Sequence, residues 1–128
     1  MSNLEKLPLE LRARLKSRSA LKIISGLNNF DSCLVERVVR AAEYGGADFV
    51  DIACDPELVH LAVEVSGLPV CVSAVDPYLF PAAVDAGASL IEIGNFDSFY
   101  PQGRMFGATE VLELTKVTRR LLPNIFLS

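Results

Sequence analysis

Residues 46–52 read GADFVDI, and residues 87–93 read GASLIEI. The two stretches match in residue type at most positions: a glycine, a small residue that turns the chain, and an apolar run with an acid inside it. A glycine that ends a helix, followed by a short apolar run, is typical of the junction between a helix and a strand. The repeat therefore predicts a protein built from equivalent βα units.

Strand and helix patterns alternate around these two junctions. Short apolar runs predict strands, and apolar stripes that follow capping acids predict helices. A leucine stripe over residues 3–17, interrupted by Pro8, predicts an N-terminal helix that becomes regular near the proline. The expected strands are residues 21–25, 49–53, 70–74, 89–93 and 124–127, and the expected helices are residues 32–44, 56–65, 76–87 and 109–122. This alternation favours a parallel sheet with right-handed crossovers, and it divides the chain into a helix (1–18) and a sheet domain (19–128).

Two architectures accommodate five parallel strands, an open doubly wound sheet and half of a (β/α)8 barrel. The chain length of 128 residues favours the open sheet, since a complete barrel takes about 250 residues. Asp51 and Glu92, in the middle of apolar strands, favour the barrel, because a sheet covered on both faces would bury them at a cost of roughly several kcal/mol. We therefore predict an α/β fold, the N-terminal half (about four and a half βα units) of a TIM (β/α)8 barrel preceded by a helix.

The composition excludes several classes of protein. Half of the residues are hydrophobic (51%) and the net charge is −4, with a pI of about 4.9, so a disordered chain or a nucleic-acid binder is not expected. No apolar run approaches the roughly 20 residues of a membrane span, and the first residues do not form a secretory signal. Three cysteines without a C-x-x-C pair suit a reducing compartment. We expect a soluble, intracellular protein.

Four segments carry a family resemblance: residues 22–30 (KIISGLNNF), 51–56 (DIACDP), 71–77 (CVSAVDP) and 91–100 (IEIGNFDSFY). In this order they resemble a conserved protein family of cyanobacteria and algal plastids, first catalogued as hypothetical chloroplast reading frame twenty-three. The resemblance runs from about residue 20 to the C-terminus. It implies an aldolase-type barrel of the phosphate-binding kind in the cytosol or the plastid stroma, and it carries no settled reaction and no assigned catalytic residues.

The chain departs from that family in length. Members of the family look about twice as long and continue past the fifth strand, whereas the phosphate site of such barrels lies in the loops after strands seven and eight. Either the 128-residue chain is a truncated product, or two copies complete each other. A lone half-barrel leaves its first and fifth strands as open edges, so we expect self-association through these edges.

Three ionisable residues are the candidates for catalysis: Lys22, Asp51 and Glu92. Inward side chains at one level of a barrel come from alternate strands, so Asp51 and Glu92 are expected in one layer. Alignment of the first strand with the repeat places Lys22 at the level of Phe49, one step below Asp51 on the same face. Two interpretations stay open, an acid/base pair and a structural ion cluster. A Schiff-base role of Lys22 is disfavoured by its place early in the strand.

The carboxyl ends of the strands, which form the active face of a barrel, supply the candidates for substrate binding. They are Ser25, Asn28, Ser73, Asn95, Asp97 and Arg104. Arg104 belongs to the long connection over residues 94–107, where its planar fork suits a phosphate or carboxylate and where a solvated surface charge is the alternative. Three further acids, Asp31, Asp55 and Asp76, are predicted to cap helices.

The spacing of the acids and cysteines matches no metal-ligand motif, so no metal is expected, and the sequence does not identify a cofactor. Cys54 is interpreted as a buried structural thiol, and His60 as a residue on the outside of the barrel. Three functions remain as hypotheses. The first is an enzyme or part of one that acts on a small phosphorylated or carboxylated metabolite. The others are a non-catalytic binding or regulatory barrel protein and an inactive truncated product.

Overall fold

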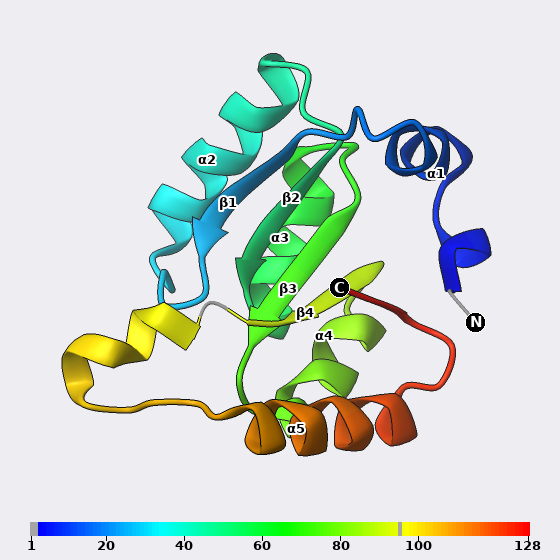
Figure 1. Cartoon of the computed structure of the whole chain (residues 1–128). Coiled ribbons are helices and arrows are strands. Elements are labelled where there is room, and N and C mark those ends of the chain that lie inside the picture. Colours follow the sequence, from blue (N-terminus) through cyan, green and yellow to red (C-terminus); the bar gives the residue numbers. More distant parts are fainter. Residues whose placement is uncertain (1–2, 95) are drawn as a thin grey trace.

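The computed structural model describes residues 3–94 and 96–128 and consists of five strands that alternate with helices (Figure 1). The strands are β1 (Lys22–Gly26), β2 (Phe49–Ala53), β3 (Val70–Ala74), β4 (Leu90–Ile93) and β5 (Phe126–Leu127). The helices are α1 (Leu9–Lys16), α2 (Ser32–Tyr44), α3 (Pro56–Val65), α4 (Phe80–Asp85) and α5 (Ala108–Leu121). Three 3₁₀ helices complete the chain: η1 (Asn3–Lys6), η2 (Pro77–Leu79) and η3 (Phe96–Gln102).

The strands form one parallel sheet in the order β1-β2-β3-β4-β5. Consecutive neighbours are the rule in a (β/α)8 barrel, whereas the order of a flavodoxin-type sheet is 2-1-3-4-5. The predicted α/β fold class, with five parallel strands that alternate with helices after an N-terminal helix, is confirmed, and the strand order is consistent with the N-terminal half of a (β/α)8 barrel.

The repeat from which the fold was predicted has a common backbone geometry. Gly46 and Gly87 follow α2 and α4 with φ angles of +80° and +124°, a region that side chains with a Cβ rarely adopt. Each glycine turns the chain into the next strand, β2 or β4, within three residues. The two GA motifs are therefore equivalent helix-to-strand turns.

Two expected elements differ in detail. The helix expected over 76–87 is divided into η2 and α4, because Pro81 lacks a backbone N–H and its ring does not allow a continuous α-helix through that position. The connection over 94–107 contains η3 rather than irregular chain only. The N-terminal helix is divided at Pro8, the N-cap of α1, as the sequence indicated.

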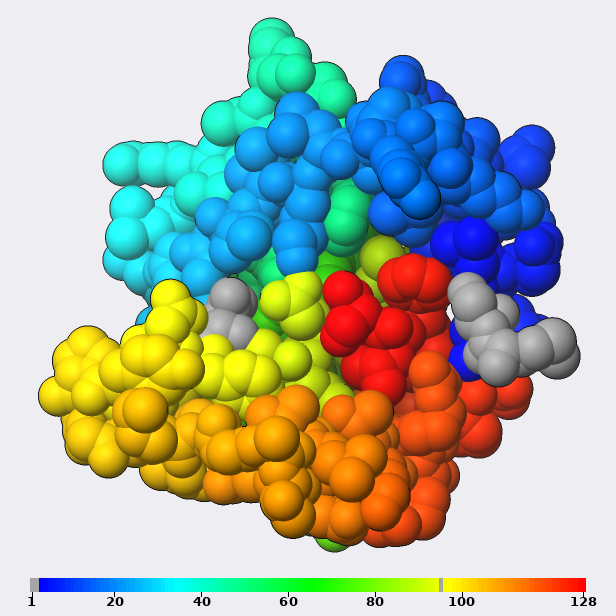
Figure 2. Space-filling model, viewed as in Figure 1, coloured from blue at the N-terminus to red at the C-terminus, as the bar shows by residue number. Residues whose placement is uncertain are grey.

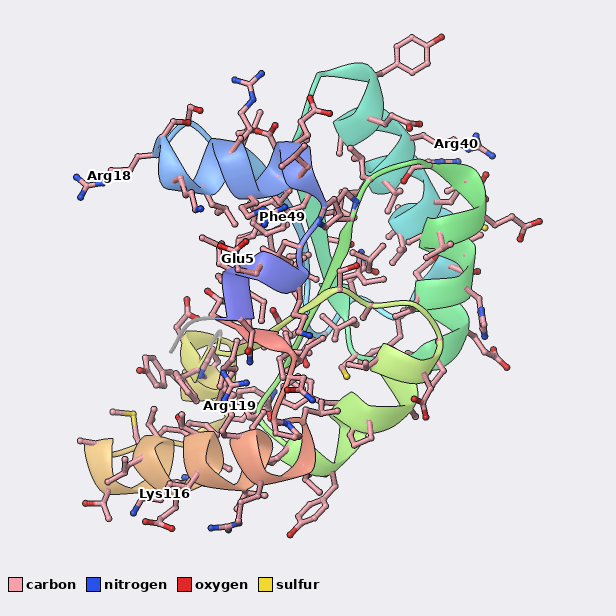
Figure 3. The ribbon with its side chains drawn as sticks, turned by 90° about the vertical axis from the view of Figure 1, so that its right-hand side faces the viewer. Glu5, Arg18, Arg40, Phe49, Lys116 and Arg119 are labelled. Atoms are coloured by element: carbon pink, nitrogen blue, oxygen red, sulfur yellow. The ribbon has the colours of Figure 1, made fainter. Side chains whose placement is uncertain are left out.

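The two faces of the sheet have different coverings. In Figure 3, α2 and α3 lie on one side of the strands and α1 lies on the other. The large apolar core fills the first side and contains outward residues of the strands, such as Val50, Ile52 and Val72. A second cluster joins Leu7 and Leu11 of the N-terminal segment to Phe49, Cys71 and Leu90. That segment thus covers the amino-terminal end of the inner face and leaves the carboxyl ends of the strands free for a site.

The helices in the described ranges are too short or too polar to cross a lipid bilayer.

Candidate functional site

Strand alternation places four polar residues on the inner face of the sheet. Lys22 is in register with Phe49, which faces the cluster beneath α1, and Asp51 is two residues further along β2 on the same face. Ser73 and Glu92 are in register with each other on β3 and β4. Figure 2 shows this face, with the green strands visible in a hollow between β1 (blue) and the yellow and red C-terminal segments.

The four side chains form one hydrogen-bonded cluster, here called the inner-face cluster (Lys22, Asp51, Ser73 and Glu92). Lys22 Nζ lies 3.3 Å from Asp51 Oδ2 and 2.5 Å from Glu92 Oε2. Ser73 Oγ donates to Asp51 Oδ1 at 2.6 Å. The side chain of Asp51 is 1% exposed, whereas those of Glu92 and Lys22 are 18% and 25% exposed. The three charged residues predicted for the inner face are therefore together, and the cluster is reached from solvent through Lys22 and Glu92.

Burial and charge act in opposite directions on the two ionisable groups at the centre. Burial raises the pKa of Asp51 above its ordinary value, and the hydrogen bond from Ser73 and the charge of Lys22 offset this only in part. Burial lowers the pKa of Lys22, but the hydrogen bond to Glu92 and the charge of Asp51 outweigh it, so that the pKa is raised overall. Lys22 is therefore held as an ammonium ion, and Asp51 retains its proton to a higher pH than an exposed aspartate.

Cys71 is a further member of this environment that the sequence reasoning missed. Its thiol and the carboxylates of Asp51 and Glu92 offer ligand atoms within 4.8 Å of one another. Burial, and next the charge of Asp51, raise the pKa of the Cys71 thiol well above its ordinary value, so the thiol form is favoured. The Lys22 ammonium contacts both carboxylates and supplies the positive charge of this group. Cys71 lies two residues before Ser73 on β3, and strand alternation therefore places both side chains on the inner face. This spacing was the signal that could have identified Cys71 from the sequence.

Gly94 is the second residue that the sequence reasoning did not single out. A Cβ built on Gly94 would lie 3.1 Å from Glu92 Oε1 and 3.3 Å from Glu92 Cγ. Both distances are shorter than ordinary van der Waals contacts, so a larger residue would push against the Glu92 side chain. The absence of a side chain at Gly94 leaves room for Glu92 to reach Lys22.

The residues predicted to bind substrate are distributed over several places. Ser25 accepts a hydrogen bond from Asn29 Nδ2 at 2.9 Å, and Asn28 lines a small cavity together with Ser73. Asp97 is exposed on η3. The structure thus brings Ser73 and Asn28 to one cavity. Asn95 lies outside the described residues.

Arg104 is engaged within its own part of the chain. Its guanidinium donates to Glu110 and to the carbonyl of Met105, and it lies 4.1 Å from the centre of the Phe106 ring. Phe106 also packs against Phe96 and Phe99, with ring centres 4.8 and 5.8 Å apart. These contacts join η3 to the start of α5. Among the described residues, Arg104 has no ion pair with a member of the inner-face cluster.

The three predicted capping acids have the expected role. Asp31 accepts from the backbone of Cys33 and Leu34, and Asp55 accepts from the backbone at the start of α3. Asp76 accepts from the N–H of Tyr78 at the start of η2. Their carboxylates are thus used by the ends of helices.

The fold and the site define a class, a parallel α/β protein of half-barrel form with an ion cluster on its inner face. The chain belongs to the family described as "Protein of unknown function (DUF561)", whose model matches residues 1–128. It is 51% identical over 115 residues to "Uncharacterized protein ycf23" of Cyanophora paradoxa, covering 89% of the chain and 47% of that protein. It is 39% identical over 114 residues to the protein of the same name of Antithamnion sp., covering 89% and 41%.

The relative of Pyropia yezoensis, also named "Uncharacterized protein ycf23", is 38% identical over 107 residues, which are 84% of the chain and 39% of the relative. These matches confirm the family that the four sequence segments indicated. The chain spans from about two-fifths to about half of the length of these relatives. The activity of the whole protein is therefore a matter for proposal.

Proposed function

We propose that the inner face binds a small phosphorylated or carboxylated metabolite and transfers a proton on it through Asp51 and Glu92. The observation that carries the proposal is the bridge that Lys22 makes between these two carboxylates. A buried acid with a raised pKa, here Asp51, next to a second carboxylate is a pattern found at sites of acid/base catalysis. The site belongs, in this proposal, to a complete aldolase-type (β/α)8 barrel.

Asp51 and Glu92 differ in environment, and the difference gives them different roles. Asp51 is buried and has a raised pKa, which suits a group that holds and donates a proton. Glu92 is partly exposed and is the carboxylate that a bound metabolite reaches first. Lys22 keeps the two at a fixed separation and balances one of their charges. Glu92 would accept a proton from the carbon next to a carbonyl group while Asp51 donates one to the carbonyl oxygen, so that the C–H bond breaks, an O–H bond forms and the enol results.

Lys22 is a positioning residue in this proposal. An amine that forms a Schiff base needs a lowered pKa, so that a neutral nitrogen is available for attack. Burial by itself would lower the pKa of Lys22, but the hydrogen bond to Glu92 and the charge of Asp51 outweigh it and raise the pKa overall. These contacts support an ammonium ion that orients the carboxylates rather than a nucleophile.

The anionic group of the metabolite needs partners beyond this cluster. Phosphate sites of (β/α)8 barrels lie in the loops after strands seven and eight, and the relatives are long enough to contain such strands. Arg104 is paired with Glu110. We therefore propose that the phosphate or carboxylate is bound by the part of the longer proteins that this chain does not cover.

The alternative to this enzyme is a non-catalytic barrel with a structural ion cluster. Exchange of the carbon-bound protons of a ligand with solvent distinguishes the enzyme from the non-catalytic barrel. The chain and the Cyanophora relative would be incubated in heavy water with small carbonyl-containing phosphates and carboxylates, and loss of carbon-bound protons followed by NMR. We expect exchange in one compound class, reduced at least about 100-fold by Asp51→Asn or Glu92→Gln. Asp85→Asn, at an exposed position of α4, is the matched control. Exchange that survives both substitutions, or variants that lose stability while ligand binding persists, would identify a structural cluster.

We further propose that the chain associates with a second copy of itself through its open strand edges. β1 is an edge of the sheet as described; Leu21, just before it, and Ile24, within it, are 47% and 50% exposed. An apolar groove of about 400 Å³ runs along this edge, between β1 and α2. The β5 edge of a second copy would supply a parallel strand that pairs with β1.

We also propose the compartment that the resemblance implies, which is the cyanobacterial cytosol or the plastid stroma.

A further inference from the structure

A small cavity lies at the carboxyl ends of β2 and β3. Its volume is about 150 Å³, and its lining includes Asn28, Cys54, Ser73, Asp76 and Phe99. The cavity is thus large enough for several water molecules or for a compound of three or four carbons. Phe99 comes from η3, so the long connection over residues 94–107 contributes a wall of the cavity.

Ser73 connects this cavity to the inner-face cluster. It is 1% exposed, lines the cavity and donates its hydrogen bond to Asp51 Oδ1. A hydroxyl oxygen that donates one bond still has lone pairs with which to accept another. Asn28, exposed at the rim, offers an amide that both donates and accepts. A hydroxyl or carbonyl group in the cavity would therefore have hydrogen-bonding partners on two sides.

The charges around the cavity are negative. Asp76 is part of its lining, and Asp55 directly follows the lining residue Cys54. Burial chiefly, and the charges of Asp55 and Asp76 in addition, raise the pKa of the Cys54 thiol to about 12. The two cations among the predicted site residues, Lys22 and Arg104, are both paired with carboxylates. A phosphate or carboxylate placed in the cavity would meet acids of the same sign, and the described residues of the lining include no cation to compensate them.

We infer that this cavity binds the uncharged end of the metabolite, a hydroxyl- or carbonyl-bearing group of three or four carbons, while the anionic group lies outside it. The inference rests on the proposed function and specifies which part of the substrate this half of the barrel recognises. Ser73 and Asn28 form the hydrogen bonds, and Phe99 covers the carbon skeleton. Ser73 places that group next to Asp51, the carboxylate assigned to proton transfer.

Dihydroxyacetone and its phosphate are the probes, because they share one uncharged end and differ in charge. Binding to the 128-residue chain would be measured through backbone amide shifts in NMR. We expect dihydroxyacetone to shift the amides of Asn28, Ser73 and Phe99, and the phosphate to bind more weakly. Ser73→Ala and Asn28→Ala should each weaken dihydroxyacetone about five- to tenfold, as the loss of one hydrogen bond predicts. Asn28 is exposed, so this variant keeps the test valid if Ser73→Ala fails to fold.

Ser89→Ala, just before β4 and outside the cavity lining, is the matched control and should leave the affinity unchanged. Tighter binding of the phosphate at these amides, or unchanged affinity in Asn28→Ala, would overturn the inference. The proposed function is tested separately, by the exchange of carbon-bound ligand protons in the Asp51→Asn variant. Exchange without cavity binding overturns only the inference, and cavity binding without exchange overturns the proton-transfer proposal.

Discussion

Lys22 and Glu92 are in contact on the inner face of the sheet although β2 and β3 lie between their strands. Neighbouring strands lie about 4.8 Å apart, so three steps across a flat sheet would separate the two backbones by about 14 Å. Side chains that stand perpendicular to such a sheet do not meet over that distance. The contact therefore requires the sheet to curl, as it does when strands close a barrel.

Replacement of Lys22 by methionine tests how strongly the cluster depends on its cation. Lys22→Met leaves Asp51 buried without its positive partner, so we expect the free energy of unfolding to fall by about 2–4 kcal/mol at neutral pH. Lys116→Met removes an exposed lysine from α5 and should cost no more than about 0.5 kcal/mol. Urea denaturation measures both. Equal losses in the two variants would contradict the assigned role of Lys22.

The pH dependence of stability tests the raised pKa of Asp51. A folded-state pKa above 3.8 means that the folded chain binds this proton more tightly than the unfolded chain. The contribution of Asp51 to stability is thus fully present below about pH 3.8 and is lost as the pH rises through the raised pKa. The stability of the chain relative to Asp51→Asn should fall with rising pH, by at most about 1.4 kcal/mol per pH unit. A relative stability that rises over this range would show that Lys22 outweighs burial.

Gly94 offers a test of the space that Glu92 occupies. Gly94→Ala places a Cβ about 3.1 Å from Glu92 Oε1, and overpacking of this kind costs about 1–3 kcal/mol. In a Glu92→Ala background the same change should cost clearly less, because the crowded atoms are gone. Gly107→Ala, where an added Cβ meets nothing within 4 Å, controls for the loss of a glycine. Additive losses in the double variant would remove the steric explanation.

Two leucines of α1 test the closure of the amino-terminal end of the inner face. Leu11 is 2% exposed and packs with Phe49 and Leu90, whereas Leu9 is 75% exposed on the same helix. Leu11→Ala should lower the free energy of unfolding by about 2–5 kcal/mol, and Leu9→Ala by about 0.5 kcal/mol or less. Thermal and urea unfolding of the pair gives the comparison. A small loss in Leu11→Ala would mean that the N-terminal segment is not needed for the core.

Sedimentation equilibrium tests association through the β1 edge. The single chain has a mass of 13.9 kDa, and we expect a larger average mass that grows with concentration. Ile24→Lys puts a charge on the exposed edge and should return the mass to that of one chain. Val63→Lys, on an exposed position of α3, is the control for an added lysine. A mass of 13.9 kDa for the unsubstituted chain at all concentrations would exclude this association.

Much of the fold followed from local signals. Helix α2, strand β2 and strand β3 have the predicted bounds, because caps, glycine turns and short apolar runs act within a few residues. The alternation of side chains along a strand also placed Lys22, Asp51 and Glu92 on one face before their distances were known. Local chemistry was sufficient for these features.

The sequence by itself determined the βα repeat, the caps and the facing of the three charged residues. Only the tertiary structure decided that Ser73 bonds to Asp51, that Cys71 lies against both acids and that Arg104 pairs with Glu110. The reason is physical: a strand fixes which way a side chain points, whereas the partner it meets depends on how far the sheet curls and how the following helices pack.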